Sequence, residues 1–245
     1  MSAHLLGNLR PVVNRVVLGS LEVTTILDGA QVRDSLSPPF GVDQTPETIA
    51  AHAAANRLPA DKFENSFTPT IVNTGKELVL FDTGNGDLRR NAGAGFLRER
   101  LGEAGYKPED IDIVAFTHVH PDHIGGVLEA GAPAFPNARY IIGQVEFDEW
   151  KRGDKVPEQR KENRQMFLEL IVPLAEKTTY LNPGDDVASG IRAVGAFGHS
   201  LGHMAYALDG GGVSALIWGD VTNHYAMSLQ RPNWRVGFDD DKDLA

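Results

Sequence analysis

Three histidines and one aspartate fall within six consecutive residues: His118, His120, Asp122 and His123. In an extended segment, residues two apart face the same side, so His118 and His120 can point together into a cavity. Pro121 bends the chain after them, which lets Asp122 and His123 approach from another direction. Neutral imidazole and carboxylate are ligands that zinc accepts at about 2.0 to 2.2 Å. The cluster therefore predicts a metal site, and the alternative is a loop of surface histidines.

Two further candidate ligands lie far along the chain, at His199 and Asp220. Each follows an apolar run that is typical of a strand, and loop residues beyond strand ends often converge on a pocket. The two oxygens of Asp220 could bridge two ions, and the alternative is a turn-forming aspartate. An ordinary loop histidine is the alternative for His199. Asp82 also follows an apolar run, and we expect it either to orient a ligand imidazole or to form a turn.

Short apolar runs that alternate with helical patterns must position these residues. Runs rich in β-branched residues predict strands at residues 21–27, 70–73, 77–81, 111–116, 139–142, 191–194, 204–208 and 214–218. Helical patterns cover residues 47–55, 96–105, 145–150 and 164–175, the last interrupted near Pro173. Prolines punctuate residues 38–59, which could form an insertion or a lid. Mixed strands and helices without a repeat or linker indicate one continuous domain over residues 1–245, with two sheets covered by helices.

Composition excludes several classes of protein. The chain has 245 residues, of which 42% are hydrophobic and 23% charged, as in packed globular proteins. With no cysteine, disulfides and thiolate sites are excluded, and a metal must have nitrogen and oxygen ligands. The net charge of -10 argues against a nucleic-acid partner, which would need a basic surface.

The beginning of the chain lacks the basic end and the apolar run of a secretory signal. No stretch approaches the roughly 18 to 20 apolar residues that a membrane span needs. We therefore expect a cytoplasmic protein with no membrane partner.

These motifs resemble those of the metallo-β-lactamase superfamily, in which the signature His-x-His-x-Asp-His corresponds to residues 118–123. Asp82-Thr83-Gly84, His199 and Asp220 correspond to its other motifs, and the likeness is greatest to methyl parathion hydrolase-like enzymes and quorum-quenching lactonases. The resemblance implies an α+β fold, the four-layer αβ/βα sandwich. It also implies a binuclear centre of two divalent ions, with zinc expected. His118, His120 and His199 would hold the first ion, and Asp122 and His123 the second, with Asp220 shared.

The superfamily normally supplies one more histidine to the second ion, far beyond the bridging aspartate. The only histidine after Asp220 is His224, in a tail of 25 residues (245 minus 220). We therefore expect a C-terminal truncation that removes a final strand and helix. His224 could approach the site instead, or could belong to a groove wall or the surface. His203 matches no ligand motif and is interpreted as a packing or hydrogen-bonding residue.

The predicted function is metal-dependent hydrolysis of a small ester, lactone or phosphotriester. Two ions would generate a bridging hydroxide near neutral pH, and Asp122 would orient it and transfer a proton. Aromatic side chains at Phe40, Phe63, Phe67 and Trp150 could line an apolar substrate pocket or belong to the core. The alternatives are a single-iron oxygenase or redox protein on the same scaffold, and a truncated fragment with impaired catalysis.

Overall fold

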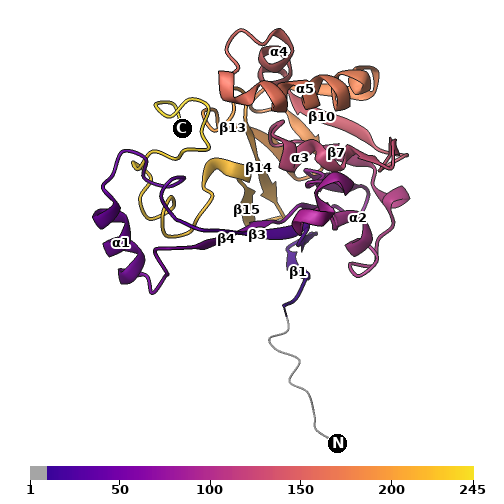
Figure 1. The fold of residues 1–245 in the computed structure, drawn as a ribbon. Helices are drawn as coiled ribbons and strands as arrows, with labels where there is room; N and C mark the ends of the chain where they lie inside the picture. The colour runs from indigo at the N-terminus through magenta and orange to yellow at the C-terminus, as the bar shows by residue number, and fades with distance from the viewer. Residues whose placement is uncertain (1–9) are drawn as a thin grey trace, which may run out of the picture.

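A seven-stranded sheet lies at the centre of the fold (Figure 1). The computed structural model describes residues 10–245. In this sheet, strands β6, β7, β10 and β11 are parallel, whereas β1, β2 and β5 are antiparallel to their neighbours. Parallel strands end at the same edge, so residues that follow β6 and β7 become neighbours there. In spatial order the strands are β1 (Val13–Leu18), β2 (Leu21–Ile26), β5 (Thr70–Asn73), β6 (Leu78–Phe81), β7 (Ile113–Ala115), β10 (Arg139–Gly143) and β11 (Thr178–Leu181).

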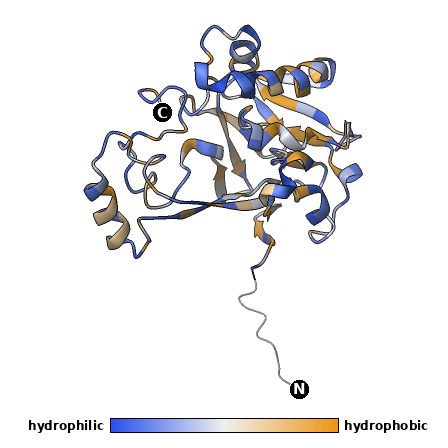
Figure 2. Cartoon of the chain, in the orientation of Figure 1, coloured by the Kyte–Doolittle hydropathy of each residue, from blue (hydrophilic) through white to orange (hydrophobic). Residues whose placement is uncertain are grey.

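Helices cover one face of this sheet. They are α2 (Leu97–Arg100), α3 (Pro121–Ile124), α4 (Gln144–Arg152) and α5 (Lys161–Leu170). Phe147, Trp150 and Phe167 from α4 and α5 join strand residues in a continuous apolar core. Figure 2 shows apolar residues along the central strands and hydrophilic residues on the outer sides of α4 and α5. Helix α2 is shorter than the predicted 96–105, because the chain turns through Gly102 and Gly105.

A four-stranded sheet packs against the other face. It consists of β12 (Asp186–Ala188), β13 (Ile191–Gly195), β14 (Met204–Asp209) and β15 (Ser214–Ile217). Its inward residues, including Ile191, Met204 and Tyr206, form a second core with the larger sheet. Its outer face is open to solvent at Val194 and Leu216, which are 39% and 49% exposed. The predicted α+β sandwich is confirmed, and residues 10–245 show three of its layers.

A hairpin and a helix extend the fold beside the sheets. Strands β3 (Gly29–Arg33) and β4 (Phe63–Phe67) pair with each other, and α1 (Pro46–Ala55) lies between them in the chain. Thr45 caps α1 by accepting a hydrogen bond from the Thr48 N–H, as expected for a helix that starts at a proline. Helix α1 packs on a third apolar cluster that contains Phe40 and Phe63. These two aromatic residues are therefore core residues and not walls of a substrate pocket.

The remaining elements are short. Strands β8 (Leu128–Glu129) and β9 (Ala132–Pro133) form a small hairpin. The 3-10 helices are η1 (Asp87–Ala92), η2 (Pro108–Asp110), η3 (Gly125–Val127), η4 (Glu158–Arg160), η5 (Val172–Lys177) and η6 (Gly219–Val221). None of the helices in residues 10–245 has both the length and the apolar character needed to cross a bilayer.

Candidate metal centre

The histidine cluster lies where β7 ends at the edge of the larger sheet. His118 and His120 follow the strand in extended chain, and Pro121 starts α3, which carries Asp122 and His123. Proline is favoured at the first position of a helix because its fixed φ suits the helix and its missing N–H is not needed. The predicted change of direction after His120 is therefore confirmed, and Val119 is buried in the core on the other side.

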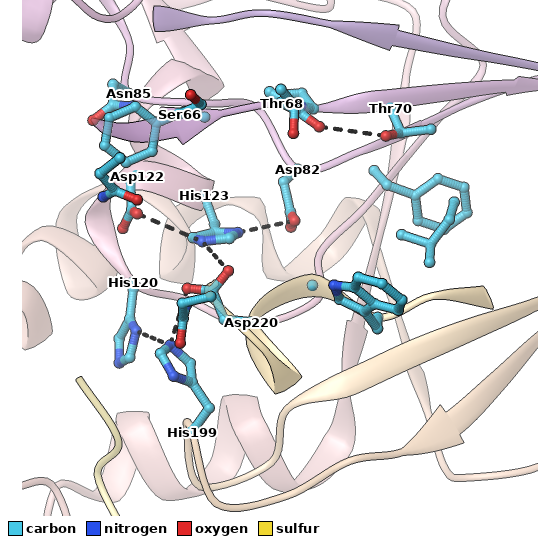
Figure 3. A pocket seen from close by; sticks show the side chains of 18 of the residues that line it. Ser66, Thr68, Thr70, Asp82, Asn85, His120, Asp122, His123, His199 and Asp220 are labelled. Atoms are coloured by element: carbon cyan, nitrogen blue, oxygen red, sulfur yellow. Dashed lines mark hydrogen bonds and ion pairs between the residues drawn. The ribbon is translucent and has the colours of Figure 1, made fainter. Parts of the chain in front are cut away.

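Three imidazoles, which the family resemblance assigns to one ion, converge in the structure. We call His118, His120 and His199 the first ligand group. His118 Nε2 lies 2.9 Å from His120 Nδ1, which lies 3.1 Å from His199 Nε2 (Figure 3 shows the last pair). A tetrahedral ion bound at about 2.0 to 2.1 Å separates its nitrogen ligands by about 3.3 Å. The two separations are close to this value, and all three nitrogens lie within 4.8 Å of one another, so they could hold one cation together.

The second ligand group consists of Asp122, His123 and Asp220. His123 Nε2 lies 3.5 Å from one Asp220 oxygen and 3.7 Å from Asp122 Oδ2. The other Asp220 oxygen lies 3.3 Å from His199 Nε2 of the first group. Asp220 thus lies between the two groups, in the position that bridging requires (Figure 3). His118 lies close enough to His123 and Asp220 to join them in a ligand set, whereas the Asp122 side chain is 31% exposed and lies at the rim.

Asp82, at the end of β6, holds the cluster from behind. Its Oδ1 accepts a hydrogen bond from the Thr117 N–H at 2.8 Å, and its Oδ2 accepts one from the Thr117 hydroxyl. The same Oδ2 lies 2.9 Å from His123 Nδ1, which leaves His123 Nε2 facing the cavity. Asp82 therefore contacts a candidate ligand imidazole, as its place after a strand predicts.

Glycines allow the site loops to approach one another closely. A Cβ on Gly126 would lie 2.0 Å from the Thr83 carbonyl oxygen, and one on Gly125 would lie 2.4 Å from that of Asn85. This contact fixes the end of α3 against the loop that carries Asp82. Gly219 has a φ of +56°, and a Cβ there would lie 2.7 Å from His203 Nε2. The ring of His203 packs against Gly219, and this contact determines the position of Asp220 after the end of β15.

His203 supports Asp220 and is not part of either ligand group. It is fully buried, and its Nε2 accepts a hydrogen bond from the Asp220 N–H at 3.1 Å. Burial lowers the pKa of His203 to about 3, so the ring is neutral and able to accept this bond. The structure therefore agrees with its interpretation as a packing and hydrogen-bonding residue.

Burial gives two members of the first ligand group, His118 and His120, the protonation state that metal binding needs. Desolvation and the neighbouring histidines lower the pKa of His118 well below its usual value. Desolvation lowers the pKa of His120 to about 4, although its contact with Asp240 opposes the shift. Both rings are therefore neutral at pH 7, and neutral imidazole is the form that coordinates metals.

The second ligand group has the opposite electrostatic balance. Desolvation alone would lower the pKa of His123, but the carboxylates of Asp82, Asp220 and Asp122 raise it well above the usual value. Desolvation would raise the pKa of Asp220, but the nearby His123 and His199 lower it. Without a cation this group therefore holds a proton on His123 among carboxylates, which is a favourable place for positive charge.

A cavity of about 680 Å³ opens over both groups, a size typical of small-molecule sites. Phe67, Leu216 and Trp218 contribute apolar surface, and Asn65, Asn163 and other polar residues line the rest. Of the four aromatic residues considered as pocket walls, only Phe67 lines this cavity. Trp150 is fully buried, and its indole N–H donates to the Ser200 hydroxyl.

His224 lies outside the two ligand groups. Its ring packs edge-on against Phe40 and Phe63, and its Nδ1 accepts the Ala226 N–H at 3.0 Å. Within residues 10–245, His224 therefore stabilises its own turn and does not join either ligand group.

Three carboxylates that sequence reasoning missed surround the site. Buried Glu146 accepts hydrogen bonds from the Val119 N–H, the Ser200 hydroxyl and the Gly202 N–H at 3.0, 2.6 and 2.6 Å. It therefore ties the His118–His120 segment to the loop that carries His199. The others are Asp239 and Asp240, which contact His199 and His120. Glu146 lies on a helix, and Asp239 and Asp240 lie in an acidic run near the end of the sequence. In neither place does the sequence show whether the carboxylate is buried or solvated.

The family follows from a direct comparison as well as from this geometry. A family model described as the metallo-beta-lactamase superfamily matches residues 68–242. This chain belongs to the metallo-beta-lactamase superfamily. The match covers more than half of the chain and includes all six predicted ligand residues.

Relatives in the superfamily share its fold over most of this chain. AidC, a dizinc quorum-quenching lactonase solved with a product, has a TM-score of 0.86 at 24% identity, covering 95% of this chain and 82% of AidC. The hydrolase AbOPH has a TM-score of 0.84 at 25% identity, covering 97% of this chain and 83% of its own.

Two curated relatives match this chain over a smaller share of their own length. A probable metallo-hydrolase of Mycobacterium tuberculosis and one of Mycobacterium bovis are each 26% identical, over 63% of this chain. The chain spans 56% of the length of these relatives.

Proposed function

We propose that this chain is a metal-dependent hydrolase that cleaves a small ester, lactone or phosphotriester. The observation that supports this proposal is the convergence of His118 Nε2, His120 Nδ1 and His199 Nε2 beside Asp220, beneath a cavity of small-molecule size. The mycobacterial relatives are named as metallo-hydrolases, and AidC is named as a dizinc lactonase. The acidic net charge of -10 also favours a small molecule over a polyanionic partner.

The proposed centre binds two divalent ions, with zinc expected. The first ligand group would hold one ion, and the second would hold the other, with Asp220 shared. When bound, such ions lower the pKa of water toward about 7 and polarise the oxygen of the bond to be cleaved.

The chain's own residues would do the remaining work. The Asp122 side chain is partly exposed at the rim of the cavity, where it can accept a proton from attacking water and return it to the leaving group. Asp82 holds His123 Nε2 toward the cavity. The apolar wall of Phe67, Leu216 and Trp218 would exclude water from one side of the substrate.

The decisive test combines metal analysis with the His120→Ala variant. We expect native protein purified without chelators to contain about two zinc-like ions per chain. We also expect it to hydrolyse a member of an ester, lactone and phosphotriester panel. His120→Ala removes one of three ligands of the first group, so we expect it to lose metal and at least roughly 100-fold of the hydrolysis.

His224→Asn is the matched control, because asparagine keeps an acceptor for the Ala226 N–H and the residue lies outside both groups. It should retain metal and turnover. Full hydrolysis by metal-poor His120→Ala would overturn the proposal. One coloured iron per native chain would favour redox chemistry instead.

A further inference from the structure

The two ligand groups contain four histidines. In each of them one ring nitrogen belongs to a ligand group and the other ring nitrogen contacts a protein oxygen. His118 Nδ1 lies 3.0 Å from the Thr117 hydroxyl, and His123 Nδ1 lies 2.9 Å from Asp82. The other two histidines contact consecutive residues of one segment. His120 Nε2 lies 3.2 Å from Asp240 Oδ2, and His199 Nδ1 lies 2.9 Å from Asp239 Oδ1.

The segment that carries these carboxylates, residues 238–245, is fixed against the His199 loop. The Asp240 N–H donates to the His199 carbonyl at 3.1 Å, and the Asp241 N–H donates to the Gly198 carbonyl at 2.9 Å. Gly198 permits this approach, because a Cβ there would lie 2.3 Å from the Ala245 nitrogen. The backbone therefore holds both carboxylates in register with the histidines.

The two side chains are also buried. The Asp240 side chain is 1% exposed and that of Asp239 is 11% exposed. Arg160 Nε donates to Asp240 Oδ1 at 2.8 Å, which leaves Oδ2 for His120. Buried carboxylates are costly unless they are paired, so the contact with His199 satisfies Asp239, and the contact with His120 satisfies the Asp240 oxygen that Arg160 leaves free.

The contacts select opposite tautomers of the two rings. A proton on His120 Nε2 leaves Nδ1 bare, whereas a proton on His199 Nδ1 leaves Nε2 bare. The bare nitrogens are the two that lie 3.1 Å apart in the first ligand group. The opposite choice in either ring would place an N–H where a cation must bind.

The carboxylates also supply charge that the first ligand group lacks. Its three members are imidazoles, a side chain that carries no negative charge. Negative charge behind the rings makes them stronger ligands and compensates a bound dication.

We propose that Asp239 and Asp240 are positioning residues that fix the tautomers of His199 and His120 and thereby set the affinity of the first metal ion. This inference rests on the metal centre of the proposed function. Nothing in it depends on the substrate.

Asparagine variants at both positions test the proposal. Asp239→Asn and Asp240→Asn keep the shape but remove the charge and add an N–H donor that can favour the wrong tautomer. Loss of such an outer partner typically weakens metal binding about 10- to 100-fold. We expect this loss for the tighter zinc ion, measured by competition with a chromophoric chelator. In metal-free protein, histidine side-chain nitrogen NMR should show single tautomers in the native chain and mixtures in the variants.

Asp243→Asn is the matched control, since Asp243 lies in the same segment, is exposed and contacts Arg235. It should bind zinc as the native protein does. If Asp240→Asn does not fold, Asp239→Asn carries the test alone, because it changes only the carboxylate that contacts His199 and is read out by the same two measurements.

Unchanged zinc affinity and unchanged tautomers in both asparagine variants would overturn the proposal. So would a lower melting temperature of the metal-free variants without any change in zinc affinity, because that result indicates a purely structural role. Native protein that binds no metal at all would instead overturn the metal centre itself.

Discussion

At the scale of single residues, the two ligand groups differ in how they are prepared for a cation. In the first group His118 and His120 are neutral, because burial lowers the pKa of His118 well below its usual value and that of His120 to about 4. The second carries a proton on His123, whose pKa is raised by Asp82, Asp220 and Asp122 against the effect of burial. A cation entering the second group must therefore displace the proton on His123, whereas His118 and His120 hold no such extra proton.

This difference predicts distinct pH dependences for the two metal ions. Between pH 6 and 7.5, binding of the first ion should displace no proton from His118 or His120, because the pKa of His118 lies well below its usual value and that of His120 is about 4. Since the pKa of His123 is raised, its proton competes more strongly as pH falls. The second ion should therefore weaken by about tenfold for each unit of decrease in pH. Calorimetry in buffers of different ionisation enthalpy should detect about one proton released with the second ion. Equal pH dependence of the two ions would contradict this assignment.

At the scale of elements, the site is assembled from the ends of strands. Strands β6 and β7 are parallel neighbours, so Asp82 and Thr117 meet at one edge. Strands β14 and β15 bring His203 and Asp220 together from the second sheet. Gly219 lies at the junction, where its backbone packs against the ring of His203. The position of Asp220 therefore depends on the absence of a side chain at residue 219.

Replacing Gly219 with alanine should move Asp220 and weaken the second ligand group. The new Cβ would lie 2.7 Å from His203 Nε2, in a backbone conformation of φ +56° that alanine disfavours. Overpacking and strain of this kind cost about 1 to 3 kcal/mol of unfolding free energy. We expect that loss in urea denaturation, together with fewer bound ions per chain.

Gly75→Ala separates the clash from the backbone strain. Gly75 also has a positive φ of +76°, but a Cβ added there would meet no atom of residues 10–245 within 4 Å. This variant should lose only the smaller cost of the conformation, about 1 kcal/mol, and keep both ions. If Gly219→Ala binds metal as Gly75→Ala does, the contact with His203 does not position Asp220.

At the scale of the whole molecule, the candidate centre connects parts of the chain that are far apart in sequence. The larger sheet supplies His118 and His120, the second sheet supplies His199 and Asp220, and the last residues supply Asp239 and Asp240. An ion bound at this junction contacts both sheets at once. Its binding free energy therefore adds to the stability of the folded chain.

Removal of metal should consequently lower the melting temperature. A ligand present at about 1,000 times its dissociation constant stabilises a protein by about 4 kcal/mol. For a chain of this size, that corresponds to a decrease of roughly 8 to 16 °C on chelation. Calorimetry before and after treatment with a chelator measures the effect, and zinc added back should restore the original value. An unchanged melting temperature in a chain shown to have lost its zinc would contradict this coupling.

The spacing of His118, His120, Asp122 and His123 was enough to predict where candidate ligands lie, because strand periodicity and the bend at Pro121 are local properties. Most central strands were predicted for the same reason. Strands β1 and β11 were not: four of the six residues of β1 are exposed and it shows little alternation, and β11 has only four residues, one of them buried. Helix α2 was predicted too long, because apolar spacing continued past the point where the chain turns.

Tertiary structure alone decided which groups support those ligands. Asp240 is 120 residues from His120 in the chain, and Glu146 is 54 residues from Ser200. No local pattern encodes a contact between residues so distant, and the cost of burying a carboxylate becomes visible only once its surroundings are known. The sequence by itself predicted the candidate ligand residues and most of the strands that carry them. The orientation of His120, His123 and His199 was decided by the packing of carboxylates far along the chain, because a hydrogen bond on one ring nitrogen fixes the state of the other.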